Sequence, residues 1–268
     1  MLRAEAIEIR IGKRLLLDAV DLTVQPGQVL AVVGPNGAGK TSLLKALVGE
    51  LTPQQGQVLQ QDRRLADWPV EVRAQLLGVL PQQSPLNFPF RVAEVVGLGR
   101  YPHHTGAKKD AAIVAGALAA VDASHLQVRT YTTLSGGEKQ RVHLARVLAQ
   151  VWEASALGER YLLLDEPTAA LDLAHQHVIL QTARRMAQQG VGVLVILHDL
   201  NLAGHYADQI VMLKNGRIAA SGDAAQVLSA DNIAEVFDIA VEVIAHPHSA
   251  RPLIVHCDLP VSHNEEST

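Results

Sequence analysis

A glycine-rich run near the start of the chain has the composition of a phosphate-binding loop. Residues 34–41 read GPNGAGKT and fit the pattern G-x-x-x-x-G-K-[ST], between a buried apolar run and a helical pattern. Glycines let backbone N–H groups turn inward around a phosphate, and the start of a helix adds positive potential. A glycine-rich turn that contains Lys-Thr by chance is the alternative, which both flanks disfavour. We therefore expect the loop to comprise Gly34, Pro35, Asn36, Gly37, Ala38, Gly39, Lys40, Thr41 and Ser42, with Lys40 on the outer phosphates.

Two acidic residues end a second apolar run. Residues 161–164 read YLLL and are followed by Asp165 and Glu166. We expect Asp165 to hold Mg²⁺ together with the hydroxyl group of Thr41. Glu166 is expected to polarise a water in line with the terminal phosphate, as phosphoryl transfer requires. The alternative is that the two acids cap the following helix, and the phosphate loop in the same chain disfavours it.

A third motif, LSGGEKQ at residues 134–140, predicts another anion site. Ser135 is expected to cap a helix whose first turn contains two glycines and so leaves its backbone N–H groups accessible. The chain has one nucleotide loop, so a second phosphate-binding helix end suggests action on a nucleotide held by a partner chain. The residues expected to take part are Leu134, Ser135, Gly136, Gly137 and Glu138.

The elements that must position these groups follow an α/β pattern. Alternating apolar residues predict an N-terminal antiparallel sheet, and continuously apolar runs predict central parallel strands. Helical patterns lie between these runs, so the order indicates a doubly wound α/β fold. The expected strands are 7–11, 20–24, 29–33, 161–164 and 191–197, the expected helices are 40–48, 110–121, 173–189 and one that begins near Gly136, and Asn215-Gly216 is expected to turn a hairpin.

The predicted domain organisation is one domain over residues 1–268 with an inserted helical part. Residues from about 85 to 150 are helical without a clear strand, and they interrupt the parallel-sheet pattern. We therefore expect a core made of residues 1–84 and 151–268 and a helical subdomain over about 85–150. One further strand is expected at Leu253–Cys257, before a fraying C-terminus.

Composition excludes several classes of protein. With 48% hydrophobic and 19% charged residues, the chain is expected to be globular. The net charge of -4 gives no basic excess for nucleic acid. The apolar run 191–197 is far shorter than the roughly 20 residues that span a bilayer, and no secretion leader is recognised, so a cytosolic protein is expected. The single cysteine, Cys257, agrees with a reducing compartment.

These motifs, together with Gln82 after Leu80-Pro81 and His198 in VILHD, resemble an ATP-binding-cassette ATPase over nearly the whole chain. LSGGEKQ is the most specific of them. The resemblance implies a P-loop NTPase (RecA-like) core with an N-terminal antiparallel β subdomain and an inserted α-helical subdomain. Gln82 would be the switch residue that touches metal and water, His198 would hold the γ-phosphate, and Asp172 matches a loop that crosses the dimer interface. Taken alone, His198 is more typical of a buried strand-end histidine.

The resemblance also implies a mechanism and partners. Two identical chains would sandwich two ATP molecules head to tail, each between one chain's phosphate loop and the other's Ser135–Gly137. Hydrolysis would remove the γ-phosphate contacts that hold the homodimer closed, and the dimer would open.

One position departs from the family pattern. Members usually carry an aromatic residue in the first hairpin that stacks on adenine, and the matching residue here is Ile11. No aromatic residue precedes Trp68, so the N-terminal strands supply no stacking ring. Because base stacking is worth about 1–3 kcal/mol, weak discrimination between bases is expected. The alternative is that another residue, including one of the partner chain, stacks instead.

Within the family, the chain is most similar to separate ATPase subunits of importers. The absence of a fused membrane span, a long heptad insertion or a second cassette disfavours exporters and the DNA-repair and translation types. Residues 83–104 are similar to subunits that import iron siderophores, haem and cobalamin. The FPF-to-GR combination with residues 152–177 is most similar to haem importers of Gram-negative bacteria. This implies a membrane permease dimer, an indirect periplasmic binding protein, no nucleic acid, and a peripheral place on the cytoplasmic face of the inner membrane.

The sequence leaves alternatives to haem import open. An iron siderophore and cobalamin are the alternative cargoes, and a soluble cassette protein acting on nucleic acid or ribosomes is the competing class. A nucleotide-dependent assembly protein with negligible turnover is a third possibility. Phe88 and Phe90 are candidates for docking the permease, or they pack within the helical subdomain.

The histidines are not expected to bind metal or haem directly. His246, His248, His256, Cys257 and His263 lack zinc-ligand spacing, and His175 and His177 lie on different faces of a predicted helix. Surface histidines are the expectation.

Overall fold

The computed structural model describes residues 1–82, 86–169, 171–249 and 251–256. A six-stranded sheet with the order β10-β9-β3-β8-β7-β6 forms its centre. All neighbouring pairs are parallel except β9 and β10, which form the predicted hairpin around Asn215-Gly216. The strands are β3 (Val29–Val33), β6 (Leu77–Leu80), β7 (Tyr161–Asp165), β8 (Gly192–Ile196), β9 (Gln209–Lys214) and β10 (Arg217–Gly222).

The central strands are apolar throughout because they are covered on both faces. Every residue of β3, β7 and β8 is buried, as continuous runs of valine, leucine and isoleucine predict for parallel strands. The predicted parallel strands at 29–33, 161–164 and 191–197 are thus confirmed.

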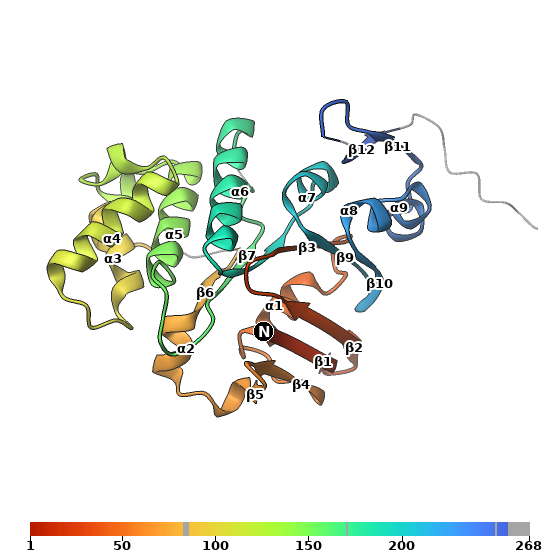
Figure 1. Cartoon of the computed structure of the whole chain (residues 1–268), viewed down its shortest axis with the longest axis horizontal. Helices are drawn as coiled ribbons and strands as arrows, with labels where there is room; N and C mark the ends of the chain where they lie inside the picture. Colours follow the sequence, from red (N-terminus) through yellow and green to blue (C-terminus); the bar gives the residue numbers. More distant parts are fainter. Residues whose placement is uncertain (83–85, 170, 250, 257–268) are drawn as a thin grey trace, which may run out of the picture.

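A second, antiparallel sheet with the order β2-β1-β4-β5 packs against the first helix. It contains β1 (Leu2–Ile11), β2 (Arg14–Val24), β4 (Gln55–Gln60) and β5 (Arg63–Arg64). The inward side chains of β1 and β2 share one apolar core with α1 (Lys40–Leu47) and one face of β3. Figure 1 shows α1 between the antiparallel sheet and the central sheet. The predicted N-terminal antiparallel strands are confirmed.

Helices make up the segment between β6 and β7, which lies to one side of the central sheet (Figure 1). Within the described part of residues 86–150 there is no strand, as predicted, although an isolated bridge joins Arg91 and Thr130. The helices of this segment are α3 (Val92–Gly97), α4 (Ala107–Ala120) and α5 (Gly136–Gln150), with 3₁₀ turns at Leu98–Arg100, Ser124–Leu126 and Tyr131–Thr133. The subdomain boundaries near 85 and 150 stay a prediction.

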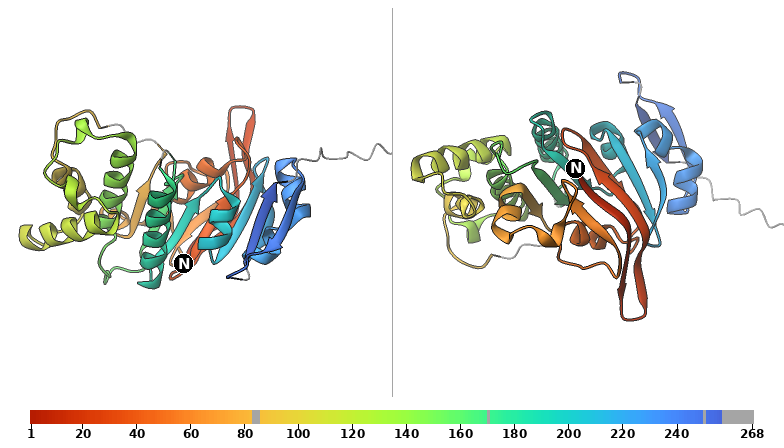
Figure 2. Two further views of the ribbon diagram at one scale, coloured as in Figure 1. Left: turned by 90° about the horizontal axis from the view of Figure 1, so that it is seen from above. Right: turned by 60° about the horizontal axis from the view of Figure 1, so that its bottom comes forward.

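The C-terminal part lies at the opposite side of the molecule (Figures 1 and 2). The strand expected at Leu253–Cys257 is β12, which the structure gives as Pro252–His256, and Cys257 and His263 lie outside the described residues. The remaining elements are a 3₁₀ turn at Leu65–Asp67, α2 (Val70–Leu76), α6 (Leu173–Gln188), α7 (Leu200–Tyr206), α8 (Ala224–Val227), α9 (Ala230–Phe237) and β11 (Val241–Ala245). Among the described helices, none is long and apolar enough to cross a membrane.

A buried arginine connects three parts of the helical segment by hydrogen bonds. Arg100 is 4% exposed, and its Nε donates to Asp110 Oδ1 at 2.8 Å. Its other nitrogens donate to the Ala149 carbonyl at 2.7 Å and to Thr105 Oγ1 at 3.0 Å. The Thr105 hydroxyl in turn donates to Asp110 at 2.6 Å. One guanidinium thus joins the turn after α3 to the start of α4 and the end of α5.

Candidate active site

The predicted phosphate loop connects the central strand β3 to α1. Gly34 has φ +152, and a Cβ there would lie 2.2 Å from the carbonyl oxygen of Leu213. Gly39 has φ +107, and its Cβ would lie 2.7 Å from the Leu16 carbonyl oxygen. Both glycines are therefore required by conformation and by close approach of neighbouring strands. Leu213 lies in β9 and Leu16 in β2, so these two strands approach the loop closely.

Lys40 lies inside this loop. Its Nζ donates to the carbonyl oxygens of Gly34 at 2.7 Å and Pro35 at 3.0 Å, and the residue is 6% exposed. Burial lowers the pKa of Lys40, and the carboxylates of Glu166 and Asp165 act in the opposite direction. Two backbone carbonyl oxygens thus hold the Lys40 ammonium inside the loop.

Asp165 is a buried carboxylate at the end of β7. It is 1% exposed, and its Oδ1 has no hydrogen-bond partner within the described residues. Burial raises the pKa of Asp165, and a hydrogen bond with Thr41 opposes that rise. A buried carboxylate oxygen without a partner, beside a threonine hydroxyl, fits Mg²⁺, which prefers hard oxygen ligands.

Glu166 is bonded from both sides. Gln82 Nε2 donates to its Oε2 at 2.8 Å, and His198 Nε2 lies 2.5 Å from its Oε1. The three residues meet because Gln82 follows β6, Glu166 follows β7 and His198 follows β8, and these parallel strands are neighbours in the sheet. Glu166 also has φ +50, a conformation that a non-glycine residue adopts at a cost of about 1–3 kcal/mol.

Two alternatives from the sequence are wrong. His198 is 48% exposed, so it is not a buried strand-end histidine. Asp165 and Glu166 do not cap α6, because that helix begins at Leu173 and Asp172 is its cap.

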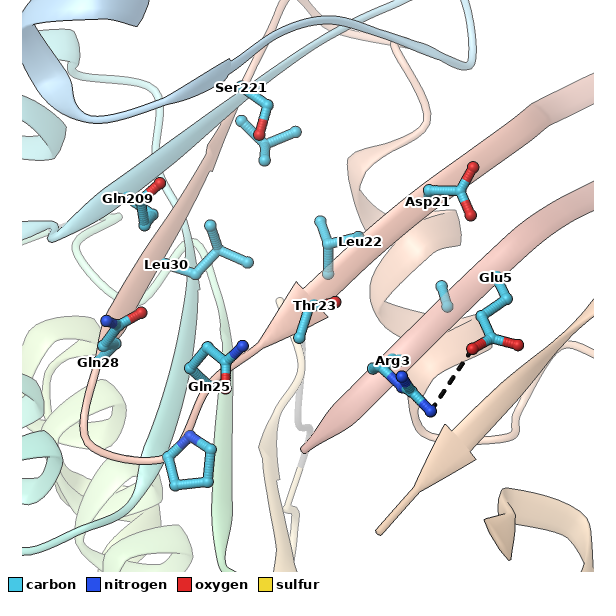
Figure 3. A pocket seen from close by; sticks show the side chains of 13 residues that line it. Arg3, Glu5, Asp21, Leu22, Thr23, Gln25, Gln28, Leu30, Gln209 and Ser221 are labelled. Carbon is cyan, nitrogen blue, oxygen red and sulfur yellow. Dashed lines mark ion pairs between the residues drawn. The ribbon is translucent and has the colours of Figure 1, made fainter. Parts of the chain in front are cut away.

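A pocket of about 350 Å³ brings Lys40, Gln82 and Glu166 together, whereas Asp165 and His198 do not line it. Its lining consists of Arg14, Leu16, Asn36, Gly37, Ala38, Gly39, Lys40, Thr41, Ser42, Gln82 and Glu166. A larger pocket of about 770 Å³ lies between the N-terminal sheet and the strands β3, β9 and β10 (Figure 3). It contains none of the predicted site residues, so the chemistry of the smaller pocket identifies it as the candidate active site.

The LSGGEKQ residues lie apart from this pocket. Ser135 caps α5, with its Oγ accepting from the Glu138 backbone N–H at 3.3 Å and Glu138 Oε2 accepting from the Ser135 N–H at 2.7 Å. The bond from the Ser135 N–H holds the pKa of Glu138 below its usual range. Gly136 is exposed with open space around it, and Leu134 is buried. Within the described residues, none of Leu134–Glu138 lines the pocket.

Asp172 caps α6 at the surface. Its Oδ1 accepts from the His175 backbone N–H at 2.8 Å and lies 2.7 Å from His175 Nδ1. The hydrogen bond from the His175 backbone N–H lowers the pKa of Asp172 most, and the bond with the His175 side chain lowers it further. Its side chain is 65% exposed and does not line the pocket, so a single chain does not bring Asp172 to the phosphate loop.

Residues 17–169, which contain the phosphate loop, Glu166 and the LSGGEKQ motif, match the family model described as ABC transporter. The chain belongs to the ABC transporter family. The fold and ATP binding follow from that membership.

Relatives of this ABC transporter chain match over almost its full length. "Hemin import ATP-binding protein HmuV" of Pseudomonas aeruginosa is 54% identical over 257 residues, which cover 95% of this chain and 99% of that protein. The protein of the same name in Gloeobacter violaceus is 51% identical over 257 residues, covering 95% of this chain and 94% of that one.

Solved ABC transporter structures share the fold. An inward-facing metal-chelate type ABC transporter superposes with a TM-score of 0.78 at 27% identity, covering 96% of each chain. A dimeric bacterial ABC transporter cassette superposes with a TM-score of 0.73 at 24% identity, covering 83% of this chain and 98% of that one. The predicted P-loop NTPase fold class is confirmed.

The sequence pointed to Ile11 at the hairpin tip, whereas the structure of the ABC transporter chain places Arg14 and Leu16 in the pocket. Ile11 is 59% exposed and does not line the pocket. Side chains alternate along β2, so Arg14 and Leu16 share one face of the strand. This alternation is the sequence pattern from which both pocket residues could have been predicted.

Within the described residues of the ABC transporter chain, no group of three or more histidine, cysteine or acidic residues is arranged to hold a metal ion. The expectation that the histidines lie at the surface is wrong for His143, which is 4% exposed and lies 2.6 Å from the Tyr131 hydroxyl.

Proposed function

We propose that this chain is the ATP-hydrolysing subunit of a bacterial importer and that its cargo is haem. The observation that carries the ATPase function is the Gln82–Glu166–His198 group at the edge of the phosphate-loop pocket. The cargo rests on relatives named as hemin import proteins, which are 54% identical to this chain.

In the proposed reaction, the loop from Gly34 to Ser42 holds the phosphates of ATP. Backbone N–H groups at the start of α1 and the Lys40 ammonium neutralise their charge. The Thr41 hydroxyl, the Asp165 carboxylate and the Gln82 amide oxygen would hold Mg²⁺, which supplies charge neutralisation to the terminal phosphates when bound.

Glu166 is the proposed general base. Its carboxylate takes the proton from the attacking water, while His198 orients that water and contacts the γ-phosphate. Both carboxylate oxygens of Glu166 carry hydrogen bonds from Gln82 and His198, so its position is fixed before the reaction. This pre-orientation lowers the entropic cost of the chemical step.

The proposed working form is a homodimer. The exposed start of α5 at Ser135–Gly137 lies outside the chain's own pocket, and it would bind the phosphates of the nucleotide held by the other chain. Asp172 would contribute to the same interface. Each dimer would bind a permease dimer at the cytoplasmic face of the inner membrane, and through it a periplasmic binding protein indirectly.

Phe88 and Phe90 are the proposed contact with the permease. Their side chains are 63% and 41% exposed, and the ring centroids lie 5.9 Å apart. Neither ring belongs to the helical core, so the sequence-based alternative of internal packing loses its support. A pair of exposed aromatic rings is typical of an interface anchor.

The cargo is tested in vesicles that contain the chain, its permease and the binding protein. Haem is expected to stimulate ATP hydrolysis, whereas a ferric siderophore and cobalamin leave the basal rate unchanged. Stimulation by one of these two compounds instead of haem would reassign the cargo while leaving the ATPase function in place.

A further inference from the structure

The β1–β2 hairpin forms one wall of the pocket, and Gln82 and Glu166 form another beside the phosphate loop. Figure 2 shows this hairpin projecting from the body of the molecule. Arg14 and Leu16 lie two positions apart on β2, so both side chains face the pocket. Gln82 and Glu166 are the proposed contacts of the metal and the attacking water, so Arg14 and Leu16 are the lining residues left for the base and ribose of a nucleotide whose phosphates lie in the loop.

The Arg14 guanidinium is available for a ligand. Neighbouring arginines are engaged in ion pairs, since Arg10 pairs with Glu8 at 2.5 Å and Arg217 with Asp18 at 2.5 Å. Arg14 makes no ion pair or side-chain hydrogen bond with any residue that the structure describes. A Cβ at Gly37 would lie 3.9 Å from Arg14 Nη2, so the guanidinium sits beside the loop.

No aromatic side chain lines this pocket among the described residues. Trp68, the first aromatic residue in the chain, is engaged elsewhere: its Nε1 donates to the Gln60 carbonyl at 3.1 Å, and Arg63 lies 5.4 Å from its ring. The planar guanidinium of arginine stacks on aromatic faces, which lysine does not do in the same way.

We propose that Arg14 holds the base of the bound nucleotide by stacking its guanidinium on the purine ring. Leu16 supplies an apolar contact beside it. The proposal rests on the proposed function, in which this pocket holds ATP for hydrolysis, and names a further contact of that site. Stacking does not read the hydrogen-bonding edge of a base, so adenine and guanine are held about equally.

The test compares ligands with and without a base. Binding of ATP, GTP and inorganic tripolyphosphate is measured by calorimetry on the full chain and on three variants: Arg14→Ala, Arg14→Lys and Lys13→Ala. Lys13 is the matched control, because it is an adjacent exposed cation that does not line the pocket.

Arg14→Ala is expected to weaken ATP and GTP by about tenfold, in the lower part of the range for base stacking, and to leave tripolyphosphate within twofold. Arg14→Lys is expected to resemble Arg14→Ala, and Lys13→Ala to resemble the unchanged chain. In steady-state kinetics, Arg14→Ala raises KM and leaves kcat unchanged.

Three results would overturn the assignment. Equal losses for ATP and tripolyphosphate would make Arg14 a phosphate contact, full rescue by lysine would make charge the relevant property, and unchanged binding would remove Arg14 from the site. If the unmodified chain binds neither ATP nor tripolyphosphate, the proposed ATPase function fails instead, and the two failures are distinguishable.

Discussion

Removing the Arg100 side chain is expected to destabilise the protein strongly. Arg100→Ala leaves the Asp110 carboxylate without its charged partner and removes the donors to Thr105 and to the Ala149 carbonyl. Breaking a buried ion pair from one side costs about 3–5 kcal/mol. The Asp110 side chain is 26% exposed, so water replaces part of the lost interaction. We therefore expect a loss of about 3 kcal/mol, the lower end of that range.

The measurement is the free energy of unfolding from denaturant titration at pH 7, for Arg100→Ala, Asp110→Asn and the double variant. Coupling between the two positions of at least about 1 kcal/mol is expected, because they are in direct contact. Arg64→Ala is the control, since Arg64 is exposed and surface changes usually stay within about 0.5 kcal/mol.

The stabilisation that Asp110 contributes depends on pH in a definite direction. Hydrogen bonds from Thr105 and Arg100 hold the pKa of Asp110 below its usual value of 3.8. The folded state therefore binds fewer protons than the unfolded state near that pH, so the stabilisation is present above it and is lost as the pH falls further. The difference between the unchanged chain and Asp110→Asn should narrow below about pH 4. An Arg100→Ala loss under about 1 kcal/mol, the usual scale of a surface ion pair, would refute the reasoning.

Two further predictions concern the reaction and its coupling. Glu166→Gln should bind ATP and accumulate as a dimer by size-exclusion chromatography with MgATP, while phosphate release falls by about 10²–10⁴-fold because the general base is lost; near-normal steady-state hydrolysis would remove Glu166 from the catalytic role. Phe88→Ala should leave the ATPase rate of the isolated chain unchanged and abolish transport in vesicles. Tyr101→Ala is the comparison variant, because Tyr101 is also exposed, at 78%. Unchanged transport by Phe88→Ala would end the docking proposal.

The sequence predicted most of the central sheet because its strands are buried on both faces. Runs such as 29–33 and 161–164 are continuously apolar, which identifies parallel strands without tertiary information. The strand β4 reads QGQVLQ and was not predicted, since glutamine and glycine carry no periodic signal. The helix α4 begins at Ala107, before the predicted start at Asp110, because Lys108 and Lys109 extend it without adding to the apolar pattern.

The sequence likewise predicted some residues of the candidate site and missed others. The phosphate loop, Asp165 and Glu166 were predicted because their chemistry lies in short contiguous motifs. The roles of Arg14 and Leu16 depend on how β2 packs over Gly39, which is a tertiary contact. The double hydrogen bond to Glu166 likewise depends on the strand order, because residues 82, 166 and 198 are distant in sequence.

The hydrogen bond between Gln82 and Glu166 connects the residue that precedes the helical segment to the interior of the central sheet. Gln82 follows the edge strand β6 and precedes the helical segment, whereas Glu166 is fixed to the interior strand β7. The donor and acceptor are 2.8 Å apart, so a displacement of the helical segment that adds about 0.7 Å along the bond breaks it by ordinary distance limits. A displacement smaller than the width of an atom is then enough to remove one of the two hydrogen bonds that hold Glu166, the proposed general base.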